Sequence, residues 1–156
     1  MRLELIHPML VHFPIALSTT GVLLRFAALW AGKKPKYSFL LPASWSILLL
    51  GLITAWASVI AGEIAEGIVG STVNRDILEE HETHAYITAS FFTFVLFIDW
   101  ARFSYLNKFL NKRRTVKRGL ALVIWFLYLF CLTNLIITGY YGANLVYEEG
   151  AAVSRK

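Results

Sequence analysis

The chain has 156 residues, of which 57% are hydrophobic and 16% are charged. A soluble globular domain has about 45–50% apolar and about 25% charged residues, so this balance excludes a water-soluble fold and indicates a surface that faces lipid. The net charge of +5 does not indicate a nucleic-acid partner, because most Lys and Arg residues are confined to two short loops. The single cysteine, Cys131, excludes a disulfide framework.

Four apolar stretches are each long enough to cross the roughly 30 Å of a bilayer's hydrocarbon as a helix. They cover residues 9–31, 39–64, 85–106 and 120–146. Because a backbone in lipid must satisfy its hydrogen bonds internally, helices are the spanning elements that fit these lengths. We therefore predict an all-α fold, a four-helix transmembrane bundle that forms one domain over residues 1–156. No internal repeat is strong enough to argue from.

Small residues predict which helix faces pack together. In the second span they recur at helical spacing, at Gly51, Ala55, Ser58 and Gly62. In the fourth span Gly139 and Gly142 lie beside a face that carries Asn134 and Thr138. Such small side chains let helix backbones approach closely in a membrane.

Charge predicts the orientation of the bundle. The loops after the first and third spans carry these basic residues: Lys33, Lys34, Lys36, Arg102, Lys108, Lys112, Arg113, Arg114, Lys117 and Arg118. The positive-inside rule assigns both loops to the cytoplasm, so both termini and the middle loop are extracytoplasmic. Nine of the ten carboxylates lie on that outer side. Arg25 and Asp99 fall outside this division, near the inner ends of their helices, where we expect them to snorkel.

All four histidines, His7, His12, His81 and His84, fall at the extracytoplasmic ends of the first and third spans. His12 lies about one turn inside the membrane boundary, where an ionisable group is costly and indicates function. His81 and His84 are three residues apart and so share a helix face. Solvation or helix capping also explains His7 and His81, whereas His12 and His84 lie at or within apolar helices.

Two imidazoles from different helices can ligate the iron of a b-type haem inside a bundle. We predict that His12 and His84 are the axial pair, with His7 and His81 as supporting or alternative cofactor-binding residues. The aromatic side chains expected around them could hold a porphyrin in an apolar slot. The leading hypothesis is therefore an integral membrane electron-transfer protein that binds haem b near the extracytoplasmic surface.

Two alternatives remain open. A non-haem metal site could use imidazole and carboxylate ligands for zinc, iron or copper. Its candidate ligands are His7, His12, His81, His84 and Glu63. The chain could instead be a cofactor-free interaction subunit whose histidines only cap helices. Because the sequence has no Gly-rich phosphate loop and no nucleophile motif, we expect an electron-transfer or binding protein rather than a stand-alone enzyme.

Two motifs bracket almost the whole chain. Residues 7–17 read HPMLVHFPIAL, and residues 139–150 read GYYGANLVYEEG. Together they resemble the hallmarks of a bacterial membrane-protein family classed as domain of unknown function 2231, although Ala143 stands where that family often has glycine. The resemblance implies a four-helix protein of the bacterial inner membrane. It also implies a link to electron transfer, because relatives are sometimes joined to c-type cytochrome modules.

The partners that we expect follow from this topology. The spans contact the lipid bilayer, and the acidic outer face suits a cationic extracytoplasmic redox partner such as a c-type cytochrome. The sequence leaves open whether the chain forms a homo-oligomer or is a subunit of a larger complex.

Overall fold

The computed structural model describes residues 3–31, 34–106 and 114–151, and these residues are almost entirely helical. The α-helices are α1 (Ile6–Leu10), α2 (His12–Ala31), α3 (Leu40–Val69), α4 (Arg75–Ala101) and α6 (Arg114–Tyr147). Short 3-10 segments lie at Leu3–Leu5, Pro35–Tyr37 and Gly70–Thr72, and a π-helical segment covers Arg102–Leu106. The predicted all-α four-helix bundle is confirmed.

Within the described residues, four helical stretches are long and apolar enough to cross a membrane. They are Leu3–Ala31, Pro35–Thr72, Arg75–Tyr105 and Thr115–Tyr147. Most extend beyond the stretches predicted from hydropathy, because polar turns at their ends remain helical. At the start of α4, for example, the Asn74 side chain accepts a hydrogen bond from the backbone N–H of Asp76 at 2.9 Å and caps the helix.

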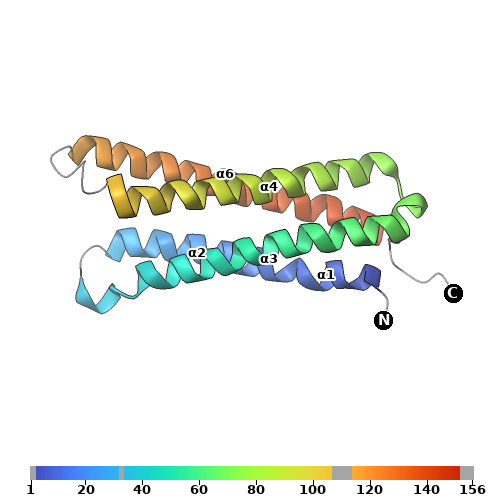
Figure 1. The fold of residues 1–156 in the computed structure, drawn as a ribbon, viewed down its shortest axis with the longest axis horizontal. Helices are drawn as coiled ribbons and strands as arrows, with labels where there is room; N and C mark the ends of the chain where they lie inside the picture. The colour runs from blue at the N-terminus through green and yellow to red at the C-terminus, as the bar shows by residue number, and fades with distance from the viewer. Residues whose placement is uncertain (1–2, 32–33, 107–113, 152–156) are drawn as a thin grey trace.

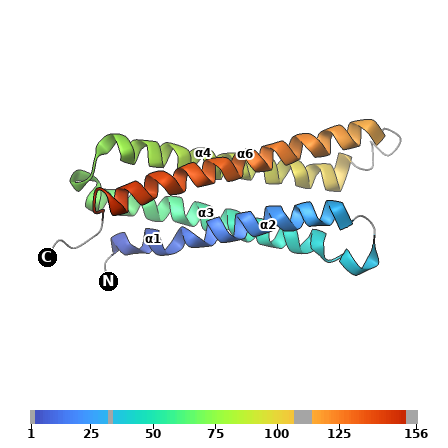
Figure 2. The ribbon, with the colours of Figure 1, turned by 180° about the vertical axis from the view of Figure 1, so that it is seen from behind.

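The helices pair as two antiparallel hairpins that lie against each other (Figure 1). The first hairpin consists of α1, α2 and α3, and the second consists of α4 and α6; the view from behind shows the same pairing (Figure 2). The described chain begins and ends at one end of the bundle, beside the connection from α3 to α4. We call this the terminal end and the opposite end the loop end.

Glycine and other small residues bring α2 and α3 into close contact. A Cβ at Gly21 would lie 2.7 Å from the Leu48 side chain, and one at Gly51 would lie 2.9 Å from the Ser18 hydroxyl. Side chains from both hairpins then fill the centre of the bundle: Val22, Leu48, Phe92, Val95, Leu96, Ile124, Trp125, Tyr128 and Cys131. The packing predicted for the small residues of the second span is therefore present at Gly51.

Equivalent contacts occur in the two hairpins, and they show an internal repeat that the sequence alone does not reveal. His7 bonds to the Ser58 carbonyl on α3, and His81 bonds to the Thr138 carbonyl on α6. A shift of 74 residues relates His7 to His81, and a shift of 80 relates Ser58 to Thr138. Few of the positions related by these shifts carry the same residue type. The repeat is therefore recognised from equivalent contacts and not from sequence identity.

Candidate functional site

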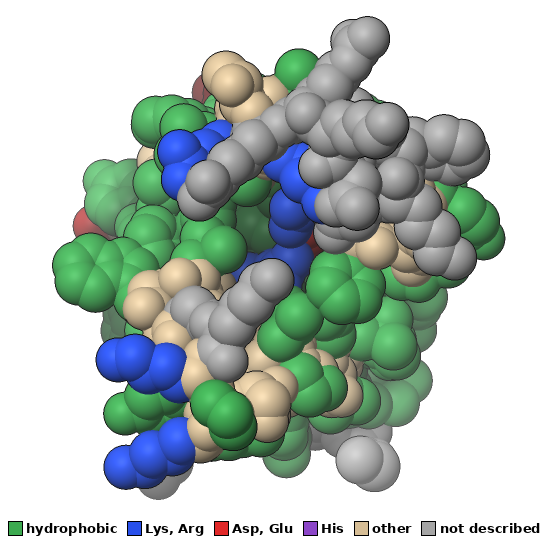
Figure 3. Space-filling view, turned by 90° about the vertical axis from the view of Figure 1, so that its left-hand side faces the viewer, with side chains coloured by type: hydrophobic (Ala, Val, Ile, Leu, Met, Phe, Trp, Pro, Cys, Tyr) green, Lys and Arg blue, Asp and Glu red, His purple; other side chains and the backbone are tan. Residues whose placement is uncertain are grey.

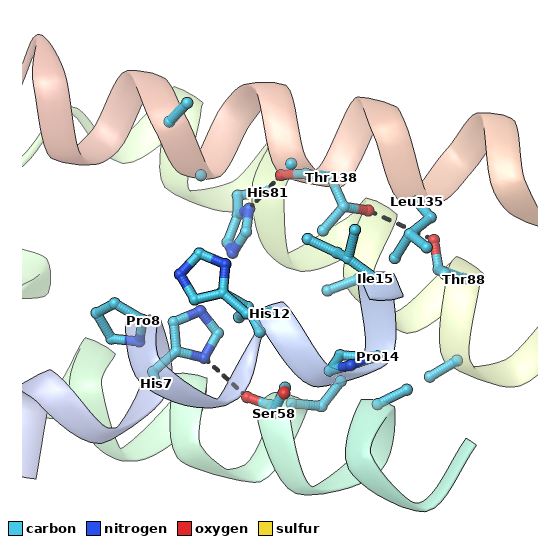
Figure 4. A pocket seen from close by; sticks show the side chains of 18 of the residues that line it. His7, Pro8, His12, Pro14, Ile15, Ser58, His81, Thr88, Leu135 and Thr138 are labelled. Atoms are coloured by element: carbon cyan, nitrogen blue, oxygen red, sulfur yellow. Dashed lines mark hydrogen bonds between the residues drawn. The ribbon is translucent and has the colours of Figure 1, made fainter. Parts of the chain in front are cut away.

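A pocket of about 340 Å³ lies between the hairpins in the terminal half of the bundle. Its lining is largely apolar, and its volume falls within the roughly 300–1,000 Å³ of ligand pockets. Three imidazoles line it: His7 from α1, His12 from α2 and His81 from α4. Figure 4 shows these side chains gathered at one end of the pocket. The structure therefore brings three of the four predicted histidines to one site.

The first hairpin holds the His7 ring in one orientation. Nδ1 of His7 lies 2.8 Å from the Ser58 carbonyl oxygen. Because a carbonyl can only accept, Nδ1 carries the proton and donates, which leaves the lone pair on Nε2. The ring lies close against Gly62, where a Cβ would stand 3.2 Å from Cε1 and Nδ1. Glycine at this position allows the imidazole to approach the α3 backbone.

The second hairpin holds His81 in the same way. Nδ1 of His81 donates to the Thr138 carbonyl at 3.0 Å, and the ring lies against Gly142. A Cβ at Gly142 would stand 3.0 Å from Cε1 of His81. Each imidazole is thus fixed by a helix carbonyl and rests on a glycine one turn further along that helix.

His7 and His81 approach each other across the boundary between the hairpins. Their ring centroids are 5.9 Å apart and their planes are nearly perpendicular, at 86°. Within the described part of the chain, no hydrogen bond engages the Nε2 atom of either ring. A histidine that ligates a metal through one ring nitrogen usually donates a hydrogen bond from the other, for example to a backbone carbonyl, and this bond orients the ring.

His12 lies at the edge of the pocket. Its side chain is exposed, and it makes no hydrogen bond or ion pair with the described residues. Pro14 lies in the first turn of the same helix, where its missing N–H leaves no intrahelical bond unmade. The first turn of α2 therefore brings an unpartnered imidazole to the edge of an apolar pocket.

His84 does not line the pocket, so the structure does not bring His84, one of the two predicted axial ligands, to the site that His12 lines. Nδ1 of His84 lies 3.2 Å from Oδ1 of Asn134, and its ring stacks on Tyr141 with centroids 5.7 Å apart. On an α-helix, side chains three residues apart point in directions that differ by about 60° around the helix axis. That rotation places the His84 ring against Asn134 and Tyr141, outside the pocket that His81 enters.

Glu63, the carboxylate among the predicted ligands of a non-haem metal, also lies outside the pocket lining. Its side chain accepts a hydrogen bond from the Tyr86 hydroxyl. Among the residues that the structure describes, no three His, Cys, Asp or Glu side chains form a group that could hold a metal ion. The five residues proposed for a non-haem metal are therefore not gathered into one ligand set.

A buried ionic cluster lies at the loop end. Nε and Nη2 of Arg25 donate to the two carboxylate oxygens of Asp99 at 2.9 and 2.8 Å. Arg102 also donates to Asp99, as does the Tyr128 hydroxyl. The expectation that Arg25 and Asp99 snorkel is wrong, because both are buried and the pair joins α2 to α4. A buried charge in an apolar bundle is stable only when it is paired and hydrogen bonded.

Sequence reasoning missed the residues that orient the imidazoles. From the sequence, Ser58 and Gly62 are expected only to pack against a neighbouring helix, and the same holds for Thr138 and Gly142. The available signal was the common spacing of a small hydroxyl residue and a glycine four positions later, which recurs 80 residues further along the chain. The structure shows what this spacing does, because each imidazole bonds to the carbonyl of the hydroxyl residue and lies against the glycine.

These features define a class of protein: a four-helix membrane bundle with a histidine-lined apolar pocket between two similar hairpins. A family model described as predicted membrane protein (DUF2231) matches residues 4–155, and the chain belongs to that family. The family predicted from the two bracketing motifs is thus confirmed. No curated protein and no solved structure matches the chain.

Proposed function

We propose that this membrane protein binds one b-type haem between His7 and His81 and transfers electrons. The proposal depends on one observation: the imidazoles of His7 and His81 lie opposite each other with their ring centroids 5.9 Å apart. Nδ1 of each ring donates a hydrogen bond to a helix carbonyl. Two imidazoles that ligate one iron, at about 2 Å from each nitrogen, have ring centroids about 6 Å apart. The spacing in this pocket is consistent with that requirement.

Each residue around the pair has a definite role in the proposal. The Ser58 and Thr138 carbonyls orient the rings and increase the electron-donating strength of Nε2. Gly62 and Gly142 leave room for the rings to rest on the helices. The apolar lining excludes water and so favours a porphyrin face over a hydrated ion. Bound haem would supply one-electron chemistry, which imidazole and hydroxyl side chains cannot.

Charge supports the placement of this site at the extracytoplasmic side of the bacterial inner membrane. Lys and Arg side chains gather at the loop end (Figure 3). Carboxylates gather at the terminal end, at Glu66, Glu79, Glu80 and Glu82. By the positive-inside rule, the loop end faces the cytoplasm. The acidic terminal end then offers a docking face for a cationic redox partner such as a c-type cytochrome.

Absorption spectroscopy tests the haem proposal. The full chain, produced in cells supplied with haem and purified in detergent, should show a Soret band. His7→Ala and His81→Ala should each abolish the low-spin spectrum, whereas the matched variant His84→Ala should retain it because His84 bonds outside the pocket. A wild-type sample without a Soret band, or a spectrum unchanged in both pocket variants, contradicts the proposal.

Elemental analysis of the same sample distinguishes the other hypotheses. Zinc, copper or iron at about one per chain without a porphyrin spectrum would support a non-haem site at these histidines. Neither metal nor porphyrin, together with unchanged stability in all four His→Ala variants, would support a cofactor-free interaction subunit.

A further inference from the structure

The pocket consists of a symmetric chamber and an asymmetric side opening. Residues related by the shifts of 74 and 80 line the chamber from both hairpins, for example His7 with His81, Val11 with Ala85 and Ser58 with Thr138. The remaining lining residues have no equivalent in the lining: Pro8, His12, Gly142, Ala143, Val146 and Tyr147. All of them belong to the first span or to α6. We call these six residues the mouth of the pocket.

Near the pocket, a hydrogen bond present on one side of the bundle has no counterpart at the equivalent positions on the other. On the α3–α4 side, the Tyr86 hydroxyl donates to Glu63 and ties the two helices together. The equivalent positions on the α2–α6 side are His12 and Ala143, and both line the pocket. Ala143 has no group that could bond to the imidazole. The side between α2 and α6 is therefore left without this tie, and the pocket extends toward it.

The mouth lies among lipid-facing side chains. Gly139, which also lines the pocket, is exposed, and a Cβ there would meet no atom within 4 Å. Phe13, Ile136 and Tyr140 are exposed on the same two spans. Since these spans are apolar enough to cross a membrane, a molecule that enters here comes from the bilayer.

The chemistry of the mouth favours an occupant with a flat ring and a polar oxygen. His12 contributes an imidazole without a hydrogen-bond partner among the described residues, in surroundings where an unpaired polar group is costly. Tyr147 contributes an exposed aromatic face on the opposite helix, suited to stacking on a flat ring. A quinone combines a flat ring, carbonyl oxygens that accept hydrogen bonds and an apolar tail that remains in lipid.

We propose that a bilayer-dissolved quinone binds in this mouth between α2 and α6, with one ring oxygen accepting a hydrogen bond from His12. This site goes beyond the proposed haem site, because the mouth lies beside the chamber and its use does not require a porphyrin. The shared pocket would bring a lipid-phase redox carrier next to His7 and His81.

Photolabelling of the full chain in phosphatidylcholine nanodiscs tests the quinone site. An azido-substituted short-chain ubiquinone should label peptides from the first span or the end of α6, and excess decylubiquinone should displace it. His12→Phe should reduce saturable labelling at least fivefold, and His12→Gln, which can still donate a hydrogen bond, should restore part of it. The matched variant His84→Phe should label like the wild type, since His84 lies outside the pocket.

A second variant tests the route without removing a polar group. Ala143→Trp should fill the mouth and abolish labelling, whereas Ile136→Trp on the exposed face of α6 should not. Labelling that excess phospholipid displaces as well as decylubiquinone does would indicate a lipid-chain groove only and would overturn the proposal, as would equal labelling of wild type and His12→Phe. Because labelling is read without haem, a missing Soret band affects only the haem proposal.

Discussion

Arg25 and Asp99 form a two-point ion pair inside the bundle, with hydrogen bonds of 2.9 and 2.8 Å, and the same 74 residues separate them as separate His7 from His81. The two pairs lie toward opposite ends of the bundle, and each has one residue in the first span, Leu3–Ala31, and one in α4. One end therefore joins the hairpins by complementary charge, and the other leaves two like groups facing a cavity.

Loss of Arg25 should destabilise the bundle strongly. Arg25→Met removes one partner of a buried ion pair, and we expect a loss of about 3 kcal/mol in the free energy of unfolding. Arg102→Met should cost less, because Arg102 is more exposed and lies on the same helical stretch as Asp99. Denaturant unfolding in micelles, followed by circular dichroism, measures both. Equal losses in the two variants would contradict a special role for the inter-hairpin pair.

Gly142→Ala should disturb His81. The new methyl group would lie 3.0 Å from Cε1 of the imidazole, so the ring must move, and we expect a loss of about 1–2 kcal/mol in stability. Gly62→Ala should have a smaller effect, because the corresponding distance to His7 is 3.2 Å. The control is Gly67→Ala, where a Cβ meets nothing within 4 Å. Thermal unfolding of the three variants should rank them in that order, with Gly142→Ala the least stable.

His84 and Asn134 should be energetically coupled to each other. Nδ1 of His84 on α4 lies 3.2 Å from Oδ1 of Asn134 on α6. Hydrogen bonds between membrane helices contribute about 0.6 kcal/mol each on average. A double-mutant cycle with His84→Leu and Asn134→Leu measures this coupling. The cycle pairing His84→Leu with Thr54→Val should give none, because Thr54 bonds to its own helix. Strictly additive effects of the first pair would show that the contact contributes nothing.

Cysteine labelling should establish the membrane orientation. In a Cys131→Ser background, Glu79→Cys should react with a membrane-impermeant maleimide in intact spheroplasts if the orientation proposed from the positive-inside rule, with the terminal end outside, is correct. Lys36→Cys, at the loop end, should react only after lysis. The reverse pattern would show that both termini face the cytoplasm and that the acidic end cannot meet an extracytoplasmic partner.

The sequence by itself determined the class of fold. Four apolar stretches longer than a bilayer's hydrocarbon leave helices as the spanning elements, and two motifs at positions 7–17 and 139–150 identified the family. It also indicated the four histidines, because ionisable groups near apolar spans are costly and therefore conspicuous. These inferences need only composition, length and position along the chain.

Only the tertiary structure decided which histidines meet. His81 and His84 are one helical turn apart, and sequence spacing cannot say which of them faces the other hairpin, because that depends on the rotation of α4 against the first hairpin. The same rotation aligns Asp99 with Arg25, 74 residues away, and turns an expected pair of snorkelling charges into an internal bond. Helix packing sets both outcomes through contacts between distant residues, and such contacts have no signature in local hydropathy.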